Sequence, residues 1–432
     1  MKKLLVVLMA LLFTTGAFAQ DSGAKFNYDL WGLAFGAVGS VGSDEKWDYQ
    51  HIRLRPMFVA ENGNIKGVVR LQIDQTYGSV NSALTNGPDP SSGAGISARN
   101  IATKVQFAYL QVSNLLIPGL AFTTGLNEYY YPLIADIEGA LTGVTYNFGM
   151  GTASFYYLKI IENDEATKSR DSNPQIIPKS KDEAQAYILD VNIKAGNIDV
   201  RPALFYATAG EEVGFGTMAR PTDRRNVNVA IGAVNASGDM GAFDFDVTAA
   251  YLSQKIKDVD RAGAYGVDLG VNVKPDKNMK FGVFGTYTSG KKDVTKASFA
   301  ESTNILFDGW LPAGRLFLLQ QAGMQDFGGY YPPELQDLGY KVAATGFAAL
   351  GLSAEFTLDK LTIFGQYGYA QHAKSNAAGD KYIGSEIDVK ISYEVAPKTD
   401  LFLEYAYILA GDIFHNGDDD AQQILWGLVT RI

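Results

Sequence analysis

The sequence predicts an all-β protein, a transmembrane antiparallel β-barrel of about 18 strands with short periplasmic turns and long extracellular loops. Three observations predict this fold class. Segments of alternating apolar and polar residues recur along the chain, short turns alternate with long loops between them, and the first residues follow the pattern of an export signal. A soluble β-sandwich would not sort its connections by length so consistently.

Residues 1–19 are expected to be a cleaved signal peptide. Two lysines precede the apolar run Leu4–Phe13, and the small-residue motif "AFA" at 17–19 follows. Cleavage after Ala19 would leave residues 20–432 as a single barrel domain. After Gln20, no apolar run reaches the roughly 20 residues that a membrane-spanning helix needs.

The stretch Asn64–Gln75, "NIKGVVRLQIDQ", shows the strand pattern clearly. Side chains of a β-strand point to opposite faces with a period of two, so the apolar residues from Ile65 to Ile73 share one face and Lys66, Arg70 and Asp74 share the other. Because charge is very costly in hydrocarbon, the apolar face is expected to meet lipid and the charged face to line a pore. Strands are predicted at 25–40, 47–60, 64–76, 101–113, 119–128, 139–148, 151–162, 184–195, 198–209, 224–235, 242–253, 264–274, 280–289, 342–356, 361–371, 385–395, 401–410 and 421–432.

The connections between these segments differ systematically in length. Short turns such as "ENGN" at 61–64, "AGN" at 195–197 and "APKTD" at 396–400 close alternate pairs, with residues that suit tight hairpins. Most of the connections in between are long: 77–100, 162–183, 210–223 and 290–341. This layout places the short turns and both chain ends on the periplasmic side.

The segment 290–341 is too long and too apolar for a simple connector. Leu316 to Leu319 and the aromatic residues Phe327, Tyr330 and Tyr331 indicate that it folds back on the barrel. Two interpretations stay open: a plug or constriction in or over the lumen, and a loop packed on the outer rim.

Composition excludes several classes of protein. The chain has no cysteine, which rules out a disulfide scaffold and a thiolate metal site, and its net charge of −10 argues against a nucleic-acid partner. The three histidines stand beside no nucleophile motif such as G-x-S-x-G. We therefore expect no enzyme activity, no catalytic residue, no bound metal and no cofactor.

Two further features suit a membrane barrel. Tyrosines recur near segment ends, where amphipathic rings prefer the membrane interface: Tyr28, Tyr49, Tyr146, Tyr393, Tyr405 and Tyr407. The final segment "QQILWGLVTRI" alternates, and we expect it to pair with the first strand and close the barrel.

Charged residues on the predicted lumen face are the candidate functional residues. The basic ones lie on the second to fourth strands, with His51 beside them: Arg53, Arg55, Lys66, Arg70 and Lys104. The acidic ones lie elsewhere: Asp244, Asp246, Asp268, Glu386, Asp388 and Glu404. Opposed walls of unlike charge would orient polar solutes, and guanidinium groups pair well with carboxylate and phosphate. The alternative is that these groups only solvate the lumen and pair with one another.

The terminal block "SEIDVKISYEVAPKTDLFLEYAYILAGDIF" (Ser385–Phe414) and the stretch "FDGWLPAGRLF" (Phe307–Phe317) resemble the alginate-export family of outer-membrane porins. The resemblance implies an eighteen-stranded barrel with a basic conduit for an anionic polysaccharide, which would suit the basic wall. The sequence departs from that family in two places. "AFTTGLNEYYYP" at 121–132 lacks the Gly-Arg-Gln-like turn, and the interior carries many carboxylates.

The sequence thus favours a passive outer-membrane porin of a Gram-negative bacterium, conducting small hydrophilic and anionic solutes. One alternative is an export channel for an anionic exopolysaccharide, which would need periplasmic secretion partners. Another is a surface adhesin or structural barrel with a blocked lumen. The expected partners are outer-membrane lipid and the barrel-assembly machinery, and the oligomeric state, monomer or homotrimer, stays open.

Overall fold

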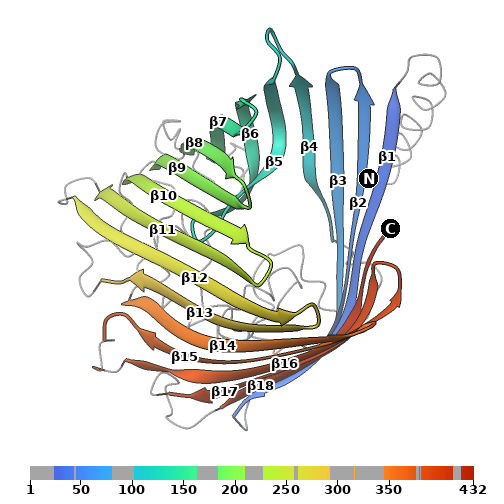
Figure 1. Cartoon of the computed structure of the whole chain (residues 1–432), viewed down its shortest axis with the longest axis vertical. Helices are drawn as coiled ribbons and strands as arrows, with labels where there is room; N and C mark the ends of the chain where they lie inside the picture. Colours follow the sequence, from blue (N-terminus) through green and yellow to red (C-terminus); the bar gives the residue numbers. More distant parts are fainter. Residues whose placement is uncertain are drawn as a thin grey trace, which may run out of the picture.

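Eighteen strands form one antiparallel sheet that closes on itself, as the sequence predicts (Figure 1). The computed structural model describes residues 24–42, 45–79, 102–162, 183–209, 227–256, 261–291, 316, 345–375, 379, 381–411 and 420–432. The predicted signal peptide and most of each long loop lie outside these residues.

The first nine strands run from the start of the chain to its middle: β1 (Lys25–Val41), β2 (Glu45–Asn62), β3 (Ile65–Ser79), β4 (Ala102–Ser113), β5 (Leu120–Tyr131), β6 (Ala135–Asn147), β7 (Gly151–Glu162), β8 (Glu183–Ala195) and β9 (Ile198–Ala209). The second nine complete the barrel: β10 (Val227–Asp239), β11 (Phe243–Ile256), β12 (Ala262–Asp276), β13 (Met279–Ser289), β14 (Gly346–Leu358), β15 (Leu361–His372), β16 (Tyr382–Ala396), β17 (Thr399–Ala410) and β18 (Ala421–Arg431).

The barrel closes between its first and last strands. β1 pairs with β2 on one side and with β18 on the other, in register from Trp31–Arg431 to Val41–Ala421. Leu30 and Ile432 exchange two backbone hydrogen bonds, each 2.9 Å long. The predicted pairing of the final segment with the first is therefore confirmed, and closure lets the backbone groups pair within the wall, which suits a strand structure in lipid.

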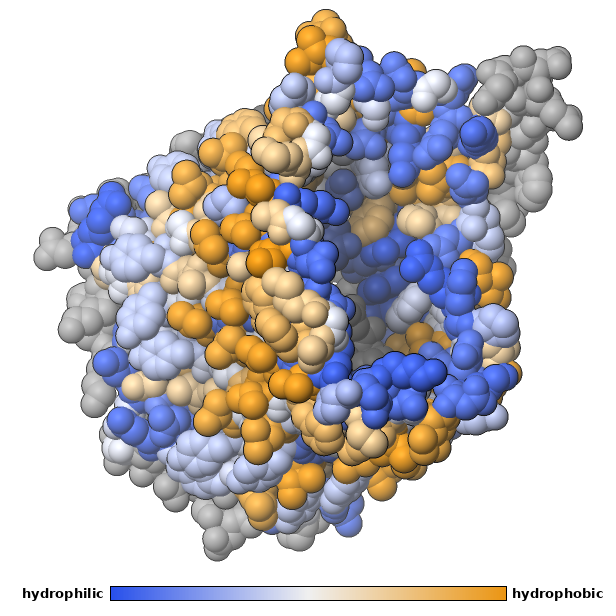
Figure 2. Space-filling view, in the orientation of Figure 1, coloured by the Kyte–Doolittle hydropathy of each residue, from blue (hydrophilic) through white to orange (hydrophobic). Residues whose placement is uncertain are grey.

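The two faces of the wall differ in polarity. Along β12, Val267, Leu269 and Val273 are exposed on the outer face, whereas Asp268 lies on the inner face. Figure 2 shows apolar side chains on the outer wall and hydrophilic ones in the hollow that the strands surround. Among the described residues, no helix is long and apolar enough to cross a membrane.

Aromatic side chains pair across strands on the outer face. Ring centroids are 5.4 Å apart for Tyr28–Phe58 and 5.4 Å apart for Tyr265–Tyr287. Tyr49 is an exception, and its predicted place at the lipid interface is wrong. It is only 1% exposed and packs edge-on against Phe35, because it shares the inward parity of Arg53.

Short turns gather on one rim of the barrel, at 63–64, 196–197, 277–278, 359–360 and 397–398. Gly63 has a φ of 59°, a backbone conformation that its residue type adopts without steric cost. On the opposite rim, three connections are short: 42–44, 132–134 and 257–261. The second of these joins the strands that depart from the regular barrel.

The hairpin of β5 and β6 leaves the wall halfway along its length. β4 pairs with β5 only from Ala108–Leu126 to Ser113–Ala121, while the ladder between β5 and β6 continues to Tyr131–Ala135. Gly125 has a φ of 132°, and a Cβ there would lie 2.3 Å from the carbonyl oxygen of Ala108. Beyond this residue the chain turns away from β4, and we call residues 127–139 the inner hairpin.

Candidate functional site: the barrel interior

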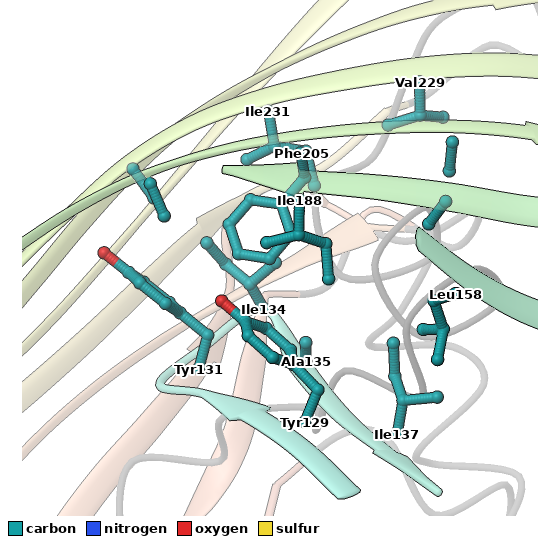
Figure 3. Packing of buried hydrophobic residues seen from close by; sticks show 14 of the residues in the cluster. Tyr129, Tyr131, Ile134, Ala135, Ile137, Leu158, Ile188, Phe205, Val229 and Ile231 are labelled. Carbon is teal, nitrogen blue, oxygen red and sulfur yellow. The ribbon is translucent and has the colours of Figure 1, made fainter. Parts of the chain in front are cut away.

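The inner hairpin lies inside the barrel and packs on the inner face of β8 and β9. The ring of Tyr131 lies 5.3 Å from that of Phe205 on β9, and the ring of Tyr129 lies 6.1 Å from it (Figure 3). β5 and β9 are four strands apart, which is about 19 Å along the wall at about 4.8 Å between neighbours. Such contacts are possible only because the end of β5 has left the wall.

Polar contacts hold the same end of the hairpin. The guanidinium of Arg201 on β9 pairs with the carboxylate of Asp190 on β8 at 2.6 Å and donates to the backbone carbonyl of Tyr130 at 2.9 Å. Tyr129 donates its hydroxyl hydrogen to Asp190 at 3.0 Å, and Tyr131 donates to the carbonyl of Arg201 at 2.5 Å. These bonds satisfy the phenol groups of two otherwise buried aromatic side chains.

The interior is therefore not polar throughout. From β7 to β11 it is covered with apolar side chains that pack under the inner hairpin: Leu158, Ile188, Phe205, Val229, Ile231 and Leu252. Because the hairpin removes these side chains from water, this part of the inner face tolerates apolar residues that a wet lumen would not.

The most buried of the predicted basic residues, Arg53, is neutralised by a carboxylate. Arg53 donates from Nε to Oδ1 of Asp74 at 2.7 Å, and both side chains are almost fully buried. Gln72 donates to Oδ2 of Asp74 at 2.6 Å, and Nε2 of His51 lies 3.8 Å from Oδ1. Arg53 is thus part of a buried network at the wall.

The remaining basic residues lie on the inner face of β2 to β4. Arg55 donates to Gln72 at 2.9 Å and covers the ring of Trp31 at 5.1 Å. Arg70 covers the ring of Phe107 at 3.7 Å. Lys66 lies apart from them, 3.7 Å from Glu61 beside the short β2–β3 turn.

The predicted acidic residues form two separate groups rather than one wall. Asp244, Asp246 and Asp268 on β11 and β12 bond to Lys274 at 2.9 Å, Asn235 at 3.2 Å and Thr286 at 2.5 Å respectively. Glu386, Asp388 and Glu404 lie on β16 and β17, all buried; Gln366 donates to Asp388 at 2.7 Å, and Lys390 pairs with Glu404.

Sequence reasoning missed the acidic residues that face the basic wall: Glu128 on β5 and Glu138 on β6. Arg70 lies 3.6 Å from Glu128, and Lys104 lies 3.0 Å from Glu138. The alternation of residues in β5 does contain a signal for Glu128. Phe122 and Leu126 share one face of the strand, and Glu128 is the next residue on that face. The face therefore changes from apolar to acidic where the strand leaves the lipid.

Leu316 places one point of the long segment 290–341. Leu316 is fully buried, and a Cβ on Gly368 of β15 would lie 2.5 Å from its Cδ2. Gly368 shares the inward parity of Gln366 and Ala370, so Leu316 lies against the inner face of the wall. The other residues of that segment that the sequence singled out, including Phe327, Tyr330 and Tyr331, lie outside the described residues.

A closed barrel with an apolar outer face and charged side chains on much of its inner face is an outer-membrane β-barrel protein. A family profile described as alginate export matches residues 160–427, which is more than half of the chain. The chain belongs to the alginate export family, as the resemblance of its terminal block predicts, and this membership assigns it to transport rather than to enzyme chemistry.

Solved structures share the fold at low sequence identity. OccK9 (OpdG) of Pseudomonas aeruginosa is 10% identical with a TM-score of 0.57, over 94% of this chain and 99% of that one. OccAB4 of Acinetobacter baumannii is 11% identical with a TM-score of 0.55, over 94% and 98%. The outer membrane protein OpdK of P. aeruginosa is 9% identical with a TM-score of 0.54, over 94% and 99%. No curated protein of similar sequence was found.

Proposed function

We propose that the protein is a porin, a passive outer-membrane channel for small hydrophilic solutes, with a preference for anionic ones. The observation that carries the proposal is the hydrophilic hollow inside the closed barrel (Figure 2). A barrel of 16–18 strands is wide enough to leave an aqueous channel, and a passive channel needs no cofactor.

The preference for anions is supported by the cationic side chains on β2 to β4. Arg55 and Arg70 both lie on this inner wall, and their planar groups match the geometry of carboxylate and phosphate. Arg53 attracts a passing anion less strongly, because its charge is already paired with that of Asp74.

The inner hairpin favours small solutes over polymers. It crosses from the β5 wall to β8 and β9, and Leu316 adds apolar volume at β15. A small solute can pass beside such obstacles, whereas a long polysaccharide needs a continuous wide path.

Export of an anionic polysaccharide is the second candidate, favoured by the match to the alginate export family. This function would require the inner hairpin to move aside and periplasmic partners to deliver the polymer. Salt-dependent binding of alginate to the purified protein, weakened by Arg55→Gln/Arg70→Gln, would support it over a small-solute porin.

The porin proposal is tested by conductance in planar lipid bilayers, with the reversal potential measured under a potassium chloride gradient. We expect steady open-channel current and a chloride preference that falls about twofold or more in Arg55→Gln/Arg70→Gln. The matched control is Lys274→Gln/Lys280→Gln, which removes two lumen cations near Asp244 on β11.

A smaller change in this control than in the arginine variant would locate the preference at β2 to β4. Folded protein that carries no current would contradict the proposal and favour a barrel with a blocked lumen. In that case the long loops become the place to look for a surface function.

A further inference from the structure

The inner hairpin brings two carboxylates directly opposite each other. Glu128 on β5 and Glu138 on β6 are cross-strand partners, on the side of the hairpin that faces β3 and β4. Like charges in this position repel because their Cβ atoms lie about 5 Å apart. The pair is tolerated because basic groups on the neighbouring strands β3 and β4 compensate for its charge.

Those compensating groups come from β3 and β4. Arg70 lies 3.6 Å from Glu128 and Lys104 lies 3.0 Å from Glu138. Gln106 joins the two pairs, because it accepts from Nε of Arg70 at 2.8 Å and donates to Glu138. The space between the inner hairpin and the β3–β4 wall is thus bridged by side chains alone, where the β4–β5 ladder has already ended.

These bridges are open to water, in contrast to the pair deeper in the wall. The side chains of Arg70 and Glu128 are 22% and 38% exposed, and those of Lys104 and Glu138 are 54% and 32% exposed. Arg53 and Asp74 are only 7% and 4% exposed. Exposed ion pairs are weak and exchange readily, so a dissolved anion can compete for Arg70 and Lys104 but not for Arg53.

We propose that Glu128 and Glu138 are built-in counter-anions that occupy the site of a permeating anion at Arg70 and Lys104 and so set the channel's anion selectivity. The ligand class is a small solute bearing a carboxylate or phosphate group, whose oxygens replace the glutamate oxygens on the guanidinium and the ammonium. This inference rests on the proposed porin function and names the residues that tune it. It also fits the mixed charge of the interior, since Arg70 and Lys104 each lie beside a carboxylate.

The test compares Glu128→Gln/Glu138→Gln with the wild-type protein in planar bilayers. Glutamine keeps the shape and removes the negative charge, so Arg70 and Lys104 stay in place without their competitors. We expect the chloride-over-potassium permeability ratio to rise about threefold. We also expect inorganic phosphate to inhibit the chloride current at about one-tenth of the wild-type concentration.

The matched control is Glu355→Gln/Glu394→Gln, which removes two carboxylates from the inner face near the β14–β15 turn. A comparable rise in this control would overturn the inference, because selectivity would then follow total lumen charge. Unchanged selectivity in both variants would overturn it as well, while leaving the porin function intact. A silent wild-type protein would overturn the porin proposal itself.

The position of the inner hairpin is checked with a single cysteine in this cysteine-free chain. Ala135 at the start of β6 is 1% exposed, so Ala135→Cys should resist a water-soluble thiol reagent while the hairpin is docked. Protection in the Glu128→Gln/Glu138→Gln background together with raised anion selectivity supports the inference. Rapid labelling in that background would attribute the change to hairpin movement and overturn it.

Discussion

Arg53 and Asp74 form an ion pair with almost no contact with solvent. Removal of one partner leaves an uncompensated charge at a buried position, which is strongly destabilising. We expect Asp74→Ala to lower the free energy of unfolding by about 3 kcal/mol. Urea unfolding of the purified barrel in detergent micelles, followed by tryptophan fluorescence, measures this loss.

Lys66 and Glu61 provide the matched comparison. They are 3.7 Å apart, and their side chains are 38% and 40% exposed. Lys66→Gln should change the free energy of unfolding by less than about 1 kcal/mol, because exposed pairs contribute little. Equal effects of the two substitutions would mean that burial does not decide the strength of lumen ion pairs in this protein.

At the level of single residues, the sequence predicted the face of a side chain but not its partner. Arg53 was expected on the inner wall because of its parity, and it lies there. Its pairing with Asp74 depends on the register across the β2–β3 turn, which places the two residues opposite each other. The role of the predicted lining residues in solute passage stays a prediction.

The inner hairpin is the element with the greatest effect on the shape of the lumen. Tyr131 is 0% exposed, and loss of its ring should cost about 3 kcal/mol of docking free energy. We expect Tyr131→Ala to release the hairpin and to raise single-channel conductance with added current noise. Bilayer recordings of single channels give both quantities.

Tyr130→Ala is the control for that variant. The side chain of Tyr130, next to Tyr131 in the chain, is 52% exposed. The substitution keeps the backbone carbonyl that Arg201 contacts. We expect the conductance of Tyr130→Ala to stay near the wild-type value. If Tyr131→Ala behaved in the same way, the apolar packing would not be what holds the hairpin.

Elements were predictable where the signal is local. A period of two and turn residues lie within a few positions of each other, so the strand segments agree with the structure to within a few residues at most ends. The inner hairpin was not predicted because its place depends on contacts with β8 and β9, far away in sequence. The one sequence feature that indicated the inner hairpin is the change to acidic residues, Glu128 and Glu138, on strand faces that are apolar earlier in the wall.

The molecule as a whole depends on the seam between β1 and β18. The ring of Trp426 covers Gly36, where a Cβ would lie 2.5 Å from ring atom Cζ2. We expect Gly36→Ala to displace the ring and cost about 1 kcal/mol through overpacking. The fraction of protein that keeps its folded mobility in an unheated detergent gel, measured against urea concentration, reports the loss.

Gly232 on β10 is the matched position within the wall. A Cβ there would lie 3.7 Å from Leu204, which is ordinary contact, so Gly232→Ala should leave resistance to urea unchanged or slightly raised. A loss of resistance in both variants would show that the effect belongs to glycine replacement and not to the closing seam.

The closing seam also dictates an order of events during folding. Each of the other neighbouring pairs in the wall consists of consecutive strands, whereas Arg431 bonds to Asp29 across 402 residues of chain. Bringing together groups so far apart costs more chain entropy than any hairpin, so this contact is expected to form last. Until then one edge of β1 and one edge of β18 carry backbone amide and carbonyl groups without hydrogen-bond partners, which are costly in the hydrocarbon core of the membrane. The sheet therefore becomes compatible with the membrane in one final step, when the pairing of the first and last strands removes its two free edges.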